Sequence, residues 1–93
     1  MKGYVLHGRS NNGVGRDYRS GWYREAGTTW EEAQVAAHAH AAKLVGEGWC
    51  VSRRRVDGSQ TWLTKRENGA LHRLLLEIEE ATIIEVEAIP CRG

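Results

Sequence analysis

The residues of this chain best suited to chemistry are basic and lie close together in the sequence. Residues 49–66 carry one acid, Asp57, and five basic side chains: Arg53, Arg54, Arg55, Lys65 and Arg66. Trp62 lies among them and offers a large apolar ring with one N–H group. Guanidinium groups beside an aromatic ring are suited to an acidic protein surface or a phosphate backbone. We therefore predict a partner-binding site at Arg53, Arg54, Arg55, Trp62, Lys65 and Arg66.

The acids are concentrated in the following part of the chain. Residues 67–93 contain two arginines and six glutamates, which are Glu67, Glu77, Glu79, Glu80, Glu85 and Glu87. A separation of positive and negative charge along the chain usually relates to the binding of partners rather than to the fold. The competing interpretation is a solvated hairpin whose arginines pair with the C-terminal glutamates, because surface ion pairs of this kind are common and weakly stabilising.

Patterns that indicate catalysis, a metal ion or a cofactor are not found in the sequence. The glycines at Gly13 and Gly15 lack the third glycine and the Gly-Lys-Ser/Thr sequence of phosphate-binding loops. His38 and His40 are two residues apart on an expected helix and project in different directions, so they cannot share a metal ion. No nucleophile-elbow motif or Ser–His–Asp order is present. We predict a non-enzymatic protein with no metal and no cofactor.

Length and composition indicate one soluble α+β domain over residues 1–93. The chain is 41% hydrophobic and 27% charged, which is ordinary for a globular protein. Its N-terminus lacks the apolar region of a signal peptide, and no apolar run approaches the roughly 20 residues that span a bilayer. We expect a cytoplasmic location in a host cell and no membrane partner. Cys50 and Cys91 are then reduced thiols by default, and a disulfide between them stays an alternative.

The elements that must position these residues are one helix and several strands. Lys2–His7 and Gly21–Ala26 read as strands, and Gly8–Gly15 reads as a loop. The helix starts at a Thr28 or Thr29 cap with Glu31 and Glu32 in its first turn. Its apolar stripe is mostly alanine: Trp30, Ala33, Ala37, Ala41 and Leu44.

After the helix, residues 49–56 and 60–66 form a predicted hairpin, and Asn68-Gly69 predicts a second tight turn. Ala70–Ile78 then reads as a strand, although its leucines fit helical spacing as well. Thr82–Ile89 reads as a last strand that ends at Pro90. The predicted order is β-β-α-β-β-β-β, with the helix packed on an antiparallel sheet.

Strand alternation in the basic hairpin puts arginine on both faces. Trp49, Val51, Arg53 and Arg55 share one face, whereas Cys50, Ser52, Arg54 and Val56 share the other. A strand buried on one side should not carry arginine on both faces. We therefore expect the outer half of this hairpin to project beyond the core that the helix covers.

Two resemblances to known families follow from these residues. TWEEAQVAAHAHAAKLVG (29–46) resembles the helix of AP2-type DNA-binding domains, which read DNA with a sheet of three strands that precede the helix. Here two predicted strands precede the helix, and the arginine run follows it.

The second resemblance covers roughly residues 1–73. A pattern of a glycine, Trp-Leu, and a lysine and a glutamate before a turn glycine falls on Gly58, Trp62, Leu63, Lys65, Glu67 and Gly69. In this pattern and in element order the chain is similar to small phage-encoded anti-CRISPR-type inhibitor proteins, apart from two extra residues after Gly58 and a long acidic C-terminal strand. The resemblance implies an inhibitor that docks on a host protein or ribonucleoprotein complex, such as a CRISPR effector. Direct binding of nucleic acid through the basic hairpin is the alternative, and a homodimer through an exposed strand edge stays open.

Overall fold

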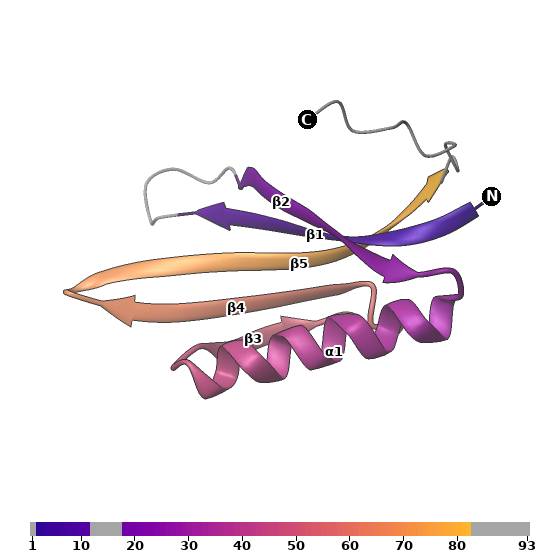
Figure 1. Cartoon of the computed structure of the whole chain (residues 1–93). Coiled ribbons are helices and arrows are strands. Elements are labelled where there is room, and N and C mark those ends of the chain that lie inside the picture. The colour runs from indigo at the N-terminus through magenta and orange to yellow at the C-terminus, as the bar shows by residue number, and fades with distance from the viewer. Residues whose placement is uncertain (1, 12–17, 83–93) are drawn as a thin grey trace, which may run out of the picture.

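Six elements follow one another in a computed structural model that describes residues 2–11 and 18–82. They are β1 (Lys2–Asn11), β2 (Arg19–Gly27), α1 (Trp30–Gly46), β3 (Cys50–Arg54), β4 (Gln60–Glu67) and β5 (Ala70–Thr82). The strands form one sheet in the order β2-β1-β5-β4-β3, in which all neighbours are antiparallel. Helix α1 lies on one face of this sheet (Figure 1). The predicted α+β class is confirmed, and the predicted last strand lies outside the described residues except for Thr82, which ends β5.

The segment from Ala70 is a strand, which decides between the two conformations that its leucines fit. Asn68 and Gly69 both have positive φ, 51° and 79°, as a two-residue hairpin turn requires. The turn leads β4 directly back into β5, and β5 then pairs with β1 on its other side. Its central position makes β5 the strand that joins the two hairpins of the sheet.

The helix begins and packs as its sequence predicts. Thr29 is the N-cap, and its Oγ1 accepts a hydrogen bond from the backbone N–H of Glu32 at 3.2 Å. Ala33, Ala37 and Ala41 are the buried residues of α1. Because these side chains are small, the helix can lie close to the sheet.

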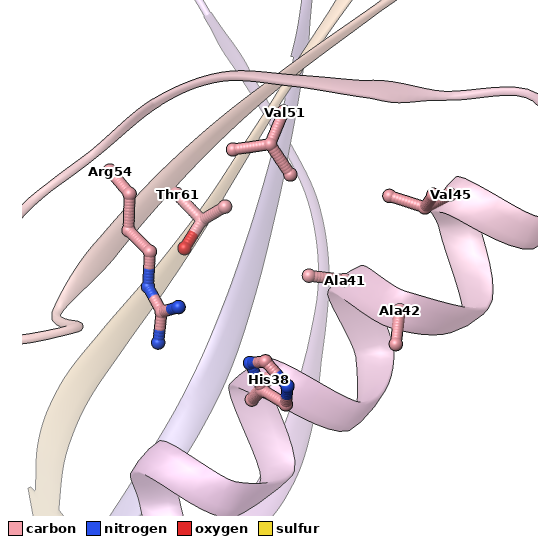
Figure 2. Close-up of a pocket in the computed structure, with 7 residues that line it drawn as sticks. All are labelled: His38, Ala41, Ala42, Val45, Val51, Arg54 and Thr61. Carbon is pink, nitrogen blue, oxygen red and sulfur yellow. The ribbon is translucent and has the colours of Figure 1, made fainter.

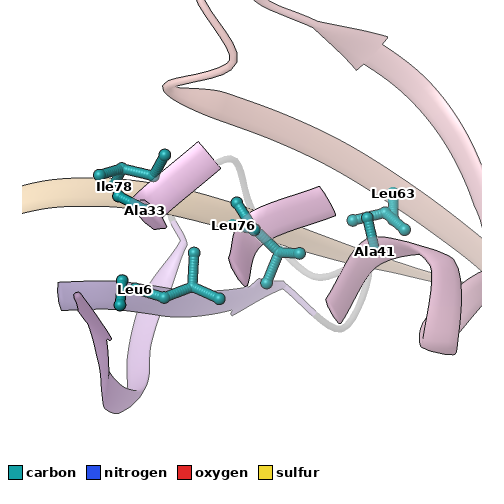
Figure 3. Close-up of a cluster of buried hydrophobic side chains, with 8 residues drawn as sticks. Leu6, Ala33, Ala41, Leu63, Leu76 and Ile78 are labelled. Carbon is teal, nitrogen blue, oxygen red and sulfur yellow. The ribbon is translucent and has the colours of Figure 1, made fainter. Parts of the chain in front are cut away.

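The core between α1 and the sheet is built from strand leucines and isoleucine against helix alanines (Figure 3). The described residues of this cluster are Leu6, Ala26, Ala33, Ala37, Ala41, Leu63, Leu76 and Ile78. Leu63 and Ala33 are completely buried, each with 0% of its surface exposed. Leu76 and Ile78 thus place one face of β5 against α1.

Strand β1 is longer than predicted, and Gly8 belongs to the strand rather than to a loop. Gly8 is paired with Trp22 of β2 and with Leu76 of β5. The indole of Trp22 lies where a side chain at position 8 would be, and its edge contacts His40 of α1 at a centroid distance of 4.9 Å. Glycine is needed here for the close approach of a ring and not for a turn.

We expect His40 to titrate below its ordinary pKa. Burial, and then the positive charges of Arg24 and Lys43, lower the pKa of His40 from 6.5, while Glu47 opposes them. The unfolded chain therefore binds the proton more tightly, and the contribution of neutral His40 to stability is lost as the pH falls through 6.5 and below. An NMR titration of the ring protons should give a midpoint below 6.5, and Arg24→Gln should move it upward. A midpoint at or above 6.5 would contradict this assignment.

Candidate functional site

A β-bulge in β3 decides where the arginine run points. Val51 pairs with Leu63 and Arg53 pairs with Trp62, so Ser52 is an extra residue in β3. The hydroxyl of Ser52 donates a hydrogen bond to the carbonyl of Trp62 at 3.2 Å. Because a bulge shifts the alternation by one residue, the prediction that Val51 and Arg53 share a face is wrong. Val51 lies on the α1 side, and Arg53 lies on the opposite side.

Arg53 lies over the ring of Trp62, with 4.2 Å between its guanidinium carbon and the ring centroid. Alternation along β4 places Thr64 and Arg66 on the same side as Trp62, and Arg73 of β5 is paired with Thr64. Arg53 and Arg66 are exposed, whereas Trp62, Thr64 and Arg73 are half-buried. We call these five residues, Arg53, Trp62, Thr64, Arg66 and Arg73, the arginine face. It is on the side of the sheet away from α1.

The other three predicted site residues lie elsewhere. Arg54 is on the α1 side of β3, where it lines a groove beside the helix. Arg55 lies in the turn after β3, with its Nε 3.8 Å from a carboxylate oxygen of Asp57. Lys65 is also on the α1 side, because it alternates with Arg66 along β4. Its Cε is 3.6 Å from the position that a Cβ on Gly48 would take. The structure therefore brings Arg53, Trp62 and Arg66 to one face and separates them from Arg54, Arg55 and Lys65.

The arginines of this face have no acidic partner within the described parts of the chain. The acids of β5 are engaged with cations of β1. Glu77 and Glu79 lie 3.5 and 3.7 Å from Arg9, and Glu80 lies 3.3 Å from Lys2. The predicted pairing with C-terminal glutamates is thus not found for these three acids, and Glu85 and Glu87 are outside the described residues.

Sequence reasoning missed Arg73 and Thr64 as members of the face. The signal that could have found them is the Asn68-Gly69 turn. A two-residue turn sets the register of its hairpin, so it places position 73 opposite position 64.

A second polar cluster surrounds His7 on the same side of the sheet, toward β2. His7 is 1% exposed, and its ring stacks on Tyr23 at a centroid distance of 4.0 Å. Its Nε2 is 2.8 Å from Ser20 Oγ, and its Nδ1 is 3.2 Å from Glu79 Oε1. Nδ1 is also 3.4 Å from Arg9 Nε. With Nδ1 protonated, the ring donates to Glu79 and accepts from the Ser20 hydroxyl; with Nε2 protonated, it donates to Ser20 Oγ and accepts from Arg9, so both nitrogens have a partner in either tautomer.

This cluster contains donor types that can hold a divalent cation. One ligand atom from each of His7, Glu77 and Glu79 can lie within 4.8 Å of the others. Arg9, however, already supplies a positive charge to both carboxylates, and Gln60 donates a hydrogen bond to Glu77. A metal ion would have to displace the guanidinium. We therefore interpret the cluster as a network of hydrogen bonds and ion pairs that holds β2, β1 and β5 together.

The order Ser20–His7–Glu79 is also that of a nucleophile, a base and an orienting acid. Sequence reasoning could not find it, because the pairing of β1 with β5 joins residues more than seventy positions apart.

The remaining sequence expectations concern cysteines and membranes. Cys50 is an exposed free thiol, and Cys91 lies outside the described residues. Among residues 2–11 and 18–82, no helix is both long enough and apolar enough to cross a membrane.

Comparisons with known proteins leave the site to be judged on its geometry. No protein-family model, no curated protein sequence and no solved structure matches the chain.

Proposed function

We propose that this chain is a small non-enzymatic binding protein that docks on a host nucleic-acid-handling complex through its arginine face. The observation that carries the proposal is that Arg53 and Arg66 are exposed without an acidic partner in the described residues, while the acids of β5 are engaged with Arg9 and Lys2. A phage or mobile-element inhibitor of a CRISPR effector is the most concrete form of this function.

The geometry supports docking because the face is built on strands. Arg53 is held against the Trp62 ring by a cation–π contact, so less side-chain freedom is lost when a partner binds. Positive charge without an internal partner also attracts an acidic surface before contact and raises the association rate.

The test is a charge reversal within the face. Guide-loaded CRISPR effector complexes, purified as a panel, are captured on a biosensor and exposed to the wild-type chain and to the double variant Arg53→Glu, Arg66→Glu. Two charge-assisted pairs together contribute about 3 kcal/mol or more, so the double variant should bind at least about a hundredfold more weakly. The matched control is Arg19→Glu with Arg24→Glu, which makes the same change in net charge on β2. Equal affinity of the two double variants would contradict docking through the arginine face.

Direct binding of single-stranded nucleic acid is a second candidate, and the position of Arg73 favours it. Arg73 adds a third guanidinium to a sheet face that already presents Trp62, and sheets with aromatic and basic side chains bind unstacked bases. Three neutralised phosphates predict a log–log salt dependence with a slope of about −2. Fluorescence anisotropy with a labelled oligothymidylate between about 50 and 200 mM salt measures this slope. Absence of binding at the lowest salt would exclude this candidate.

A further inference from the structure

A groove lies between α1 and β3 (Figure 2). The register of β3 puts it on the opposite side of this strand from the arginine face. Its volume is about 150 Å³, and its lining is shared by helix, edge strand and β4: His38, Ala41, Ala42, Val45, Val51, Arg54 and Thr61. Val45 and Val51 leave 49% and 47% of their surface exposed on either side of it. Because β3 is an edge strand, the groove opens at the border of the sheet.

Arg54 stands at the mouth of this groove without an acidic partner in the described residues. It also borders two adjoining hollows, one along the outer side of α1 with Glu31 and Gln34, and one at the hairpin turn with Arg55 and Asp57. Glu31 borders the first of these hollows without an ion pair to Arg54, and Asp57 pairs with Arg55. The positively charged guanidinium of Arg54 therefore borders an apolar groove that is exposed to solvent.

We propose that this groove binds an extended acidic segment of the protein partner. One apolar side chain of the segment would occupy the groove, and a neighbouring carboxylate would pair with the guanidinium of Arg54. The inference rests on the proposed docking function and adds a second contact on the other side of β3. The size is suitable, because an apolar cavity of about 150 Å³ accepts a group as large as benzene. The charge is suitable because a carboxylate can pair with a guanidinium through two hydrogen bonds. The bulge at Ser52 makes the double contact feasible, since it puts Arg54 rather than Arg53 on the same side of β3 as Val51, while Arg53 lies on the other side.

The experiment uses NMR of the full chain, labelled with ¹⁵N, and a synthetic peptide in which aspartate and serine flank one central leucine. We expect shifts of the amide signals of Ala42, Val45, Val51 and Arg54. The same peptide with alanine in place of leucine should bind more weakly, and so should the peptide with asparagine in place of aspartate.

Two pairs of variants separate the groove from general attraction of charge. Arg54→Glu should weaken peptide binding about tenfold or more, whereas Arg55→Glu, with the same change in net charge, should have a clearly smaller effect. Ala42→Trp should fill the groove and abolish the shifts. Ala70→Trp is the matched control, because Ala70 is exposed at the far turn between β4 and β5. Thermal melting of each variant verifies that it is folded.

The outcomes distinguish this inference from the proposed function. Shifts confined to Arg53, Trp62 and Arg66 would overturn the groove and leave docking through the arginine face standing. Equal losses for Arg54→Glu and Arg55→Glu would also overturn it, and so would groove shifts produced by an oligonucleotide or by raising the concentration of the chain alone. If neither surface responds to the peptide and the effector panel is not bound, both proposals fail.

Discussion

Replacing Leu63 with alanine should lower the free energy of unfolding by about 2–5 kcal/mol, because the side chain is completely buried and its removal leaves a cavity. Leu63 points from β4 into the core between α1 and the sheet. Strand β4 lies between β3 and β5. The loss is large for a chain of this size, since small domains are stable by only about 5–15 kcal/mol. Urea unfolding followed by circular dichroism measures it.

The matched control is Leu71→Ala. Leu71 is half-buried at the start of β5, so the same change of side chain should cost clearly less. Equal losses at Leu63 and Leu71 would show that the core does not lie where the structure puts it. A Leu63→Ala variant that no longer unfolds cooperatively would agree with the placement of Leu63 in the core. In that case Leu63→Val should give a smaller loss of unfolding free energy that can still be measured.

Adding one methyl group at Gly8 should destabilise the fold by about 1–3 kcal/mol, as overpacking of a rigid site does. A Cβ at position 8 would lie only 2.6 Å from Cζ2 of Trp22, so the indole would have to leave its place against His40. We therefore expect Gly8→Ala both to lower the urea midpoint and to alter the fluorescence of Trp22.

The control for Gly8→Ala is Gly46→Ala, which should not lower the free energy of unfolding. Gly46 ends α1 and has no heavy atom within 4 Å of an added Cβ, so Gly46→Ala should be neutral or stabilising by up to about 1 kcal/mol. A neutral Gly8→Ala would mean that Trp22 does not pack over β1. A loss at Gly46 comparable to that at Gly8 would contradict the reason given for both.

Local rules were enough to predict much of the fold. The Thr29 cap, the alanine stripe and the Asn68-Gly69 turn each depend on residues close together in the sequence, and each is confirmed. Pairing between distant strands was beyond such rules. Gly8 read as a loop because its strand partners, Trp22 and Leu76, lie 14 and 68 positions away, and no local pattern shows that an indole will cover it.

The candidate site was predictable in composition but not in arrangement. Trp62 and Arg66 share one face because β4 alternates regularly, and Arg53 lies on the same face because of the bulge at Ser52. The assignment of Arg53 and Arg54 to their faces failed because alternation was counted through Ser52, and a bulge is not visible in residue types. It depends on how Val51 and Arg53 are matched to β4.

The bulge at Ser52 also has a consequence for how such a chain changes over generations. Deleting this single residue would restore regular alternation and leave the residues that follow it on their present sides, because Arg53 would still be paired with Trp62 if the pairing of Val51 with Leu63 is kept. A chain that kept Ser52 in a regular ladder would instead pair Ser52 with Trp62 and turn Arg53 toward α1. The side on which each arginine lies thus depends on whether the extra residue is bulged, with no arginine substituted. In descendants of this chain, equivalent arginines should be identified by their pairing with β4 and not by their order in an alignment.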